Sequence, residues 1–299
     1  MITVGIVSTG AMGGAFGRVL GAKGARVVAT VEGRSSRTQQ LARGIELVPT
    51  LDAVVAASGI VLSIVPPGAA LEVADAIGAA AARTGARPIV ADLNAIAPAT
   101  MGAVADCLAA TGLGVVDGSI SGPPPRSAET TTVYLSGPRA AEVVESLGAP
   151  ELELLVVGET IGRASAVKMS TASFYKGQTA LLAQALRAAQ ANDVLEIVLD
   201  DLRRHYPDLI DNAPRLLQSI AAKSGRYVAE MEEIAASQER VGLGSDLFTA
   251  LAVLYRGISE SDLAETAPED VDPTVPLGQL LARLGSRRDP PKGEQTSAR

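Results

Sequence analysis

The chain has 299 residues, a length that suits two domains rather than one ordinary core. A net charge of −7, the lack of a Lys/Arg cluster and the scarcity of aromatic residues argue against a nucleic-acid partner, and one Cys with one His cannot form a Cys/His metal site. Without a charge-free stretch long enough for a bilayer, and without a basic leader, the sequence favours a cytoplasmic protein with no membrane partner and no metal.

The first half of the chain alternates short β-branched runs with alanine-rich runs, the pattern of a parallel sheet with crossover helices. We predict strands at Thr3–Val7, Arg26–Val31, Ile60–Val65, Pro88–Asp92, Gly114–Asp117 and Thr131–Ser136. We predict helices at Met12–Lys23, Ser36–Arg43, Gly68–Thr84 and Pro98–Thr111. The fold class is therefore α/β, with a Rossmann-type parallel sheet at residues 1–158.

The second half is predicted to be helical because its β-branched runs nearly stop after Gly158. A stretch without proline, from Gly162 to about Val198, predicts one long interdomain helix. Further helices should be separated at Tyr206–Pro207, Lys223–Gly225 and Val241–Ser245. We expect an all-helical domain at residues 159–287 and a disordered, proline-interrupted tail at 288–299.

The first predicted strand runs into a turn of small residues and then a helix, the context that a dinucleotide fingerprint needs. The turn and the helix start consist of Ser8, Thr9, Gly10, Ala11, Met12 and Gly13. Gly10 would let the backbone approach a pyrophosphate, and Gly13 would let the helix pack closely on the strand. Ser8 stands where the fingerprint has its first glycine, and an ordinary strand-to-helix turn is the alternative reading.

The end of the second predicted strand bears on the choice of nicotinamide cofactor. An acidic residue there binds the ribose of NAD, whereas an arginine accommodates the 2′-phosphate of NADP. The sequence offers Glu32 for NAD and a small anion site of Arg34, Ser35 and Arg37 for NADP. Because three donors converge, we favour NADP and keep NAD as the alternative.

Lys168 is the candidate general acid and base. Hydride transfer to or from an alcohol carbon requires a group that exchanges the hydroxyl proton, and a lysine can do this when its pKa is lowered towards neutrality. Its neighbours on the predicted helix are too apolar for an ordinary surface lysine, although a solvated side chain is the alternative. Helical spacing places Thr171, Tyr175 and Lys176 near the same face, where Tyr175 could relay a proton and Lys176 attract an anion.

Residues beyond the fifth strand complete the candidate site. Ser121 and Gly122 follow that strand, where an open α/β sheet places its ligand, and a serine hydroxyl in a tight turn suits a carboxylate. The alternative is a proline-rich loop chosen for its shape alone. A small anionic substrate fits these groups.

Three motifs, in this order, resemble those of the β-hydroxyacid dehydrogenases, the superfamily of 3-hydroxyisobutyrate and 6-phosphogluconate dehydrogenases. They are the cofactor fingerprint Gly5–Gly13, the substrate segment Asp117–Pro123, and the start of the interdomain helix, Gly162–Lys168. The later residues Lys168-Met169, Lys176-Gly177 and Met231-Glu232-Glu233 are similar to a phosphogluconate-dehydrogenase-like branch of unknown substrate.

The resemblance implies an NADP-dependent oxidoreductase that interconverts a small hydroxy acid and its keto form, with Lys168 in catalysis. It places Val65, Pro66 and Asn94 beside the cofactor and Pro123 in the substrate segment. It also implies that the C-terminal helices close over the substrate and form a homodimer.

The sequence departs from the family pattern near the lysine. The family has Asn where this chain has Ala172 and a second glycine where it has Pro123, and 6-phosphogluconate enzymes have Glu where it has Tyr175. These changes argue against 6-phosphogluconate and simple 3-hydroxyisobutyrate as substrates.

Two other functions remain open. An imine reductase of the same architecture would replace the lysine, so Lys168 counts against it while Tyr175 favours it. A regulatory protein that binds NADP without turnover is the third hypothesis, and steady consumption of NADPH with keto acids would separate it from the enzymes.

Overall fold

The computed structural model describes residues 2–126, 130–266, 271–272 and 274–286. The chain forms two compact units, Met1–Thr171 with Ala236–Gly242, and Ala172–Ala235 with Leu243–Arg299. The longest helix contributes residues to both units. The domain boundaries predicted at 158/159 and 287/288 therefore stay a prediction, and the predicted tail at 288–299 lies outside the described residues.

The described residues of the first unit form an eight-stranded sheet in the order β3-β2-β1-β4-β5-β6-β7-β8. The strands are β1 (Thr3–Val7), β2 (Arg26–Ala29), β3 (Glu46–Leu47), β4 (Ile60–Ser63), β5 (Ile89–Asp92), β6 (Gly114–Ser121), β7 (Thr131–Ser136) and β8 (Leu152–Val156). Neighbours from β3 to β6 are parallel, β7 runs antiparallel to β6, and β8 is parallel to β7. The predicted Rossmann-type sheet is thus confirmed.

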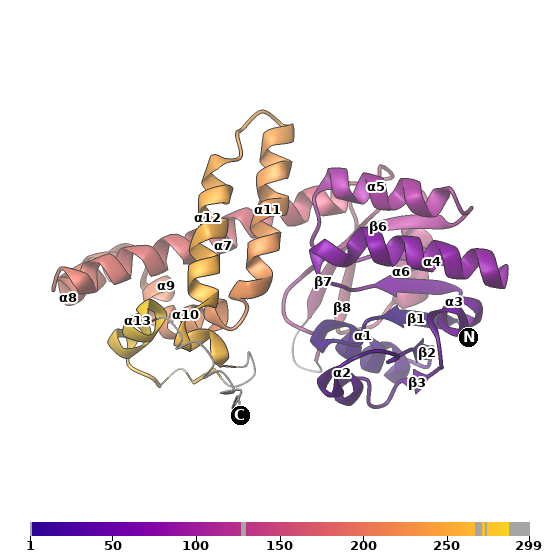
Figure 1. Ribbon diagram of the computed structural model, residues 1–299, viewed down its shortest axis with the longest axis horizontal. Coiled ribbons are helices and arrows are strands. Elements are labelled where there is room, and N and C mark those ends of the chain that lie inside the picture. The colour runs from indigo at the N-terminus through magenta and orange to yellow at the C-terminus, as the bar shows by residue number, and fades with distance from the viewer. Residues whose placement is uncertain (1, 127–129, 267–270, 273, 287–299) are drawn as a thin grey trace, which may run out of the picture. The chain divides into compact units, whose positions relative to one another are not determined.

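Helices cover both faces of this sheet (Figure 1). They are α1 (Ala11–Ala22), α2 (Ser36–Leu41), α3 (Leu51–Ala57), the 3₁₀ turn η1 (Pro67–Ala69), α4 (Ala70–Thr84), α5 (Pro98–Ala109) and α6 (Ala140–Leu147). Buried residues of α1 and α6 pack on one face, and those of α3, α4 and α5 on the other. The alanines that dominate these helices let them approach the sheet and one another closely.

The sequence-based prediction missed four elements of this unit. Strand β3 has only two residues, both exposed, and β8, on the other edge of the sheet, has five residues of which one is buried. Helix α3 is a short helix whose cap is Thr50, which accepts a hydrogen bond from the amide of Ala53 at 3.2 Å. The fourth is α6. Short elements such as these carry too few periods for a pattern to stand out.

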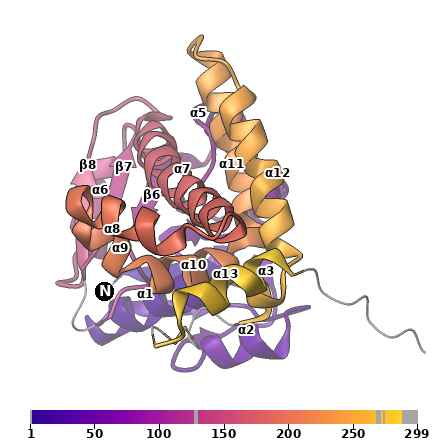
Figure 2. The same cartoon turned by 90° about the vertical axis from the view of Figure 1, so that its left-hand side faces the viewer.

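The second unit is helical throughout its described part. The helices are α7 (Arg163–Ala191), α8 (Leu195–His205), α9 (Pro207–Asp211), α10 (Ala213–Ala221), α11 (Ser224–Arg240), α12 (Asp246–Ser259), η2 (Asp262–Glu265) and α13 (Leu277–Gly285), of which α7 and α11 also belong partly to the first unit. Helices α10 and α13 lie side by side (Figure 2), both contact η2, and Leu217, Leu263 and Leu280 of these three elements are fully buried. Among all described helices, none has both the length and the apolar character to cross a membrane.

The prediction of one helix as far as Val198 is wrong. Helix α7 ends at Ala191, and α8 begins at Leu195. Asp193 between them has φ of +56°, a left-handed conformation that breaks the helical hydrogen-bond pattern. The three predicted helix separations are confirmed, at Tyr206, around Lys223 and at Val241–Ser245.

A fully buried carboxylate fixes the start of α7 to the sheet. Asp117, on β6, accepts hydrogen bonds from the backbone amides of Gly162, Ala164 and Ser165 at 2.8–3.2 Å. The hydroxyls of Ser136 and Ser165 donate to it at 2.8 and 2.7 Å. A negative charge at a helix N-terminus satisfies amides that have no partner within the helix and interacts favourably with the helix dipole.

Asp117→Asn should lower the free energy of unfolding of the first unit by about 3 kcal/mol, because the amide replaces an acceptor by a donor and leaves buried N–H groups unpaired. Asp106→Asn, at an exposed position of α5, is the matched control and should change it by less than about 0.5 kcal/mol. Urea unfolding followed by circular dichroism measures both. Equal stability of the two variants would contradict the anchoring role.

Candidate functional site

The turn after β1 has the geometry of a phosphate-binding loop. Ser8 has φ of +74°, so it takes the left-handed conformation that a glycine supplies in this position of the fingerprint. A Cβ on Gly13 would lie 2.1 Å from the carbonyl oxygen of Ser8, so only glycine allows α1 to pack this closely on the turn. A Cβ on Gly10 would meet no atom within 4 Å, which leaves space above the loop.

The N-terminus of α1 is open to an anion. Its cap residue, Gly10, makes no side-chain hydrogen bond, and the first turn has no acidic residue. Ala11 is exposed and Met12 packs partly on the core. Thr9 is fully buried, and its hydroxyl donates to the carbonyl of Thr38 at 3.4 Å. Thr9 therefore offers a ligand its backbone, whereas the amides at the helix start suit a pyrophosphate.

The loop after β2 carries the residues predicted to choose the cofactor. Glu32, Arg34, Ser35 and Arg37 are all exposed, and Gly33 between the first two turns the chain with φ of +65°. Ser35 caps α2, since its hydroxyl oxygen accepts a hydrogen bond from the amide of Thr38 at 3.3 Å. Its hydroxyl is thus partly engaged within the protein.

The ends of β4 and β5 are joined by the side chain of Asn94. Its amide oxygen accepts from the backbone N–H of Val65 at 2.6 Å, and its amide nitrogen donates to Asp92 at 2.8 Å and Ser63 at 3.2 Å. Asn94 is only 2% exposed. The structure therefore shows Asn94 holding the Val65–Pro66 loop in place, and its predicted contact with the nicotinamide stays a prediction.

Asp92 is a buried carboxyl for which the described residues supply no ion pair. Burial raises its pKa to about 7, and the charge of Asp117 adds to the rise, while hydrogen bonds from Asn94 and Ser63 oppose it. The group is therefore half-protonated near neutral pH, directly behind the loop that Asn94 fixes.

The ammonium group of Lys168 lies at the carboxyl end of β6. Its Nζ donates to the carbonyl oxygen of Ile120 at 2.6 Å. Asp117, Ser119 and Ser121 alternate along β6 and share one face of the sheet. Asp117 holds the amides at the start of α7, and the Ser119 hydroxyl donates to the carbonyl of Ala164 at 2.9 Å, so this face is the one that α7 covers. Ser121 follows on that face next to the carbonyl that Lys168 contacts.

The other predicted residues near this strand are arranged as follows. Gly122 has φ of +117°, and Pro123 uses its carbonyl to accept the Thr131 hydroxyl at 2.7 Å. The Thr171 hydroxyl donates back into α7, to the carbonyls of Val167 at 2.9 Å and Lys168 at 3.3 Å. Gly122 and Pro123 are exposed, so the turn after β6 is accessible to a ligand.

In the second unit, Lys176 has a carboxylate partner. Its ammonium pairs with Glu230, which is 4% exposed, and lies 4.5 Å from the ring centre of Tyr227. Arg226 pairs with the other oxygen of Glu230 at 3.0 Å. The ion pair offsets the charge by which Lys176 was expected to attract an anion, so its role as a substrate ligand remains a prediction. Tyr175 is 61% exposed and makes an edge-to-face ring contact with Phe174.

Three buried acidic side chains that make several hydrogen bonds or ion pairs in the structure had no role assigned to them from the sequence. Asp117 and Asp92 stand at predicted strand ends, and Glu230 directly precedes the Met231 segment. For Asp92 and Asp117 the available signal was an acidic residue in an otherwise apolar strand, since such residues are rarely buried without a specific partner. No three His, Cys, Asp or Glu side chains of the described residues group together as metal ligands.

Between pH 4 and 7 the folded protein should hold a proton on Asp92 that the unfolded chain, with a pKa near 3.8, has already lost. The free energy of unfolding should therefore fall as the pH rises through this window, by about 4 kcal/mol at most, and level off above it. Asp92→Asn lacks this titration, so the stability difference between wild type and variant should change with pH. Urea titrations at pH 4.5, 6 and 8 measure it, and parallel pH profiles would contradict the assignment.

Comparison with known proteins agrees with this geometry. Residues 3–149 match the model for the NAD binding domain of 6-phosphogluconate dehydrogenase, and residues 189–258 match a domain of unknown function, DUF1932. No curated protein sequence matches the chain.

Solved structures share the fold. A conserved protein of unknown function, described as structurally similar to 3-hydroxyacid dehydrogenases, is 29% identical, with 86% of this chain and 96% of that chain covered and a TM-score of 0.64. The 3-hydroxyisobutyrate dehydrogenase of Mycobacterium tuberculosis, solved with L-serine, is 18% identical, with 95% and 99% covered and a TM-score of 0.67. An imine reductase variant from Myxococcus stipitatus, solved with NAD⁺, is 20% identical, with 95% and 99% covered and a TM-score of 0.59.

The two family models match in chain order, and the sheet and helices have the corresponding fold. The chain therefore combines a region that matches the NAD binding domain of 6-phosphogluconate dehydrogenase with a later region that matches DUF1932.

Proposed function

We propose that the protein is an NADP-dependent oxidoreductase that interconverts a small hydroxy acid, or a related secondary alcohol, and its keto form. The observation that carries the proposal is the position of the Lys168 ammonium, 2.6 Å from the Ile120 carbonyl at the carboxyl end of β6. Ligands of open α/β sheets bind along this edge of the parallel strands.

The separation between the phosphate-binding loop and Lys168 suits a dinucleotide. Strands β1, β4, β5 and β6 are neighbours in this order, so the loop after β1 and the end of β6 are three strand spacings apart, about 14 Å. The strands between them are β4 and β5, and the Val65–Pro66 loop and Asn94 follow the carboxyl ends of these two strands. A pyrophosphate at the start of α1 would thus leave the nicotinamide half of the cofactor running towards Lys168.

The chemistry assigned to the side chains is proton transfer and binding. When bound, the nicotinamide accepts or donates the hydride. Lys168 takes the hydroxyl proton during oxidation and returns it to the carbonyl oxygen during reduction. Ser121 and the turn at Gly122 bind the substrate carboxylate, since the serine hydroxyl donates a hydrogen bond to an anion.

The preference for NADP rests on the loop after β2. Arg34 and Arg37 are exposed there and can pair with a 2′-phosphate, whereas Glu32 would repel it unless it points to solvent. NAD remains the alternative, because Glu32 could instead bind the ribose hydroxyls.

A homodimer is part of the same proposal. Several large apolar side chains of the second unit are more than 60% exposed, a pattern typical of protein interfaces. They are Leu181 on α7, Ile197 on α8, and Leu247 and Val253 on α12.

Lys168→Ala should lower the turnover of NADPH with a panel of small keto acids by about 10²–10⁴-fold, because the proton donor is lost. The affinity for NADPH should remain unchanged. Lys23→Ala, an exposed lysine at the end of α1, is the matched control and should keep full turnover.

The same assay separates the competing functions. Turnover of cyclic imines but not keto acids would indicate an imine reductase, and saturable NADPH binding without turnover of either would indicate a regulatory protein. Near-normal turnover by Lys168→Ala would exclude this lysine from the mechanism.

Arg34→Ala should weaken NADPH binding at least about tenfold, through loss of a charge-assisted pair with the 2′-phosphate, and leave NADH binding nearly unchanged. Glu32→Gln removes a negative charge from the same loop and serves as the control, since it should not weaken NADPH binding. Fluorescence titration of the reduced cofactors measures the dissociation constants. Tighter binding of NADH than NADPH by the wild type, lost in Glu32→Gln, would show that Glu32 sets an NAD preference.

A further inference from the structure

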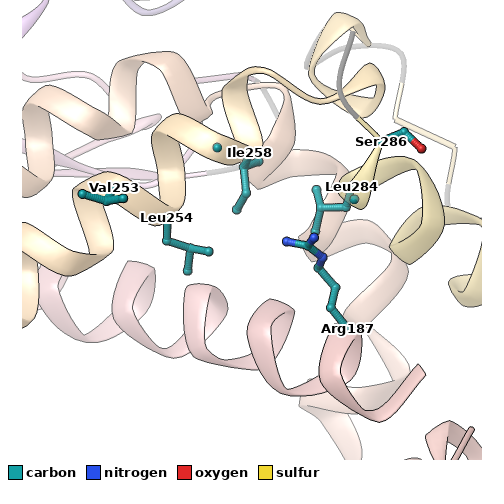
Figure 3. Close-up of a pocket in the computed structure, with 8 residues that line it drawn as sticks. Arg187, Val253, Leu254, Ile258, Leu284 and Ser286 are labelled. Atoms are coloured by element: carbon teal, nitrogen blue, oxygen red, sulfur yellow. The ribbon is translucent and has the colours of Figure 1, made fainter. Parts of the chain in front are cut away.

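A cavity of about 270 Å³ lies within the second unit, between α7, α12 and α13 (Figure 3). Its apolar lining residues are Val253, Leu254 and Ile258 on α12 and Leu284 on α13, and Gly257, Gly285 and Ser286 also line it. The charged group that lines it is the guanidinium of Arg187, which extends from α7 towards Leu284 in Figure 3. A cavity with apolar residues on one part of its lining and one cation on another suits a ligand that is apolar at one end and anionic at the other.

The guanidinium of Arg187 has no hydrogen bond or ion pair to any residue that the structure describes. Arginine carries five N–H donors in a planar arrangement that matches a carboxylate through two parallel hydrogen bonds. The side chain is half-buried, so the apolar wall removes part of the water that would otherwise solvate its charge. A ligand carboxylate would replace that water with a strong pair.

Two glycines shape the cavity. A Cβ on Gly285 would lie 3.3 Å from Nη2 of Arg187, so the absence of a side chain there gives the guanidinium its place. A Cβ on Gly257, in the middle of α12, would meet no atom within 4 Å, so this part of the wall is open to a ligand. Glycine lowers helix stability relative to other residues, and its presence on the wall keeps the volume open.

We infer that this cavity binds a small carboxylate with a short aliphatic chain. The volume lies at the lower end of the range for small-molecule sites, which fits a ligand of about ten non-hydrogen atoms or fewer. The carboxylate pairs with Arg187, and the aliphatic chain contacts Leu254, Ile258 and Leu284. All of these residues belong to the second unit, whereas the phosphate-binding loop and Lys168 belong to the first. The inference therefore does not rest on the proposed activity, and of the cavity residues only Val253 also belongs to the apolar surface proposed for the homodimer.

Calorimetric titration with 3-methylbutanoate and with the neutral 3-methylbutanamide tests the site. Wild type should bind the carboxylate saturably and the amide at least tenfold more weakly. Arg187→Gln should lose at least tenfold in affinity for the carboxylate alone. Gly257→Leu, which fills the cavity with a good helix former, should abolish binding of both probes. Arg256→Gln, an exposed arginine on the same helix α12, is the matched charge control and should bind like the wild type.

Three outcomes would overturn the inference. They are equal affinity of wild type and Arg187→Gln, equal binding of acid and amide, and no saturable binding of 3-methylbutanoate at 20 mM (about the weakest affinity of interest for so small a ligand). Sedimentation velocity adds a further check, because dissociation of an oligomer by both Arg187→Gln and Gly257→Leu would make the cavity an interface between copies. NADPH titration of each variant verifies that the nucleotide-binding unit is intact.

Discussion

The candidate site depends on the interaction between one buried carboxylate and one helix start. Asp117 comes from the middle of β6 and accepts the amides of Gly162, Ala164 and Ser165, which fixes where α7 begins. Lys168 follows within the next turn and a half, so the position of its ammonium at the end of β6 is determined by that anchor. A shift of α7 along its axis would carry the lysine away from the strand end where a ligand is expected.

The shape of the phosphate-binding turn after β1 depends on the lack of a side chain at Gly13. Gly13 can only be glycine because of the Ser8 carbonyl, and Ser8 adopts a left-handed φ that costs on the order of 1 kcal/mol for a residue with a Cβ. The conformation persists because the packing of α1 on β1 determines it. The serine in place of the first glycine therefore changes the energy of the turn and not its shape.

The sequence predicts the architecture of this protein better than the details of its site. Strands β1 and β7 have the predicted bounds because runs of β-branched residues in largely buried strands show clearly in composition. The end of α7 was missed because the helix is interrupted by the left-handed backbone conformation of Asp193. The pattern of apolar residues does not predict such a conformation. Lys176 looked like an available cation on its own helix, but Glu230, 54 positions later in the chain, neutralises it. The spacing of neighbouring residues in the sequence cannot predict ion-pair partners that the tertiary structure brings together.

The three buried acidic groups show why residue type alone does not reveal chemistry. Asp117 meets the cost of burial with five hydrogen bonds, and Glu230 meets it with two cations, Lys176 and Arg226. Asp92 has fewer donors and no cation partner among the residues that the structure describes, so burial raises its pKa to about 7 instead. In the sequence all three are acidic residues among apolar neighbours. The difference between an anchor, an ion-pair centre and a group that titrates near neutral pH arises only from which N–H groups and cations the fold brings to each carboxylate.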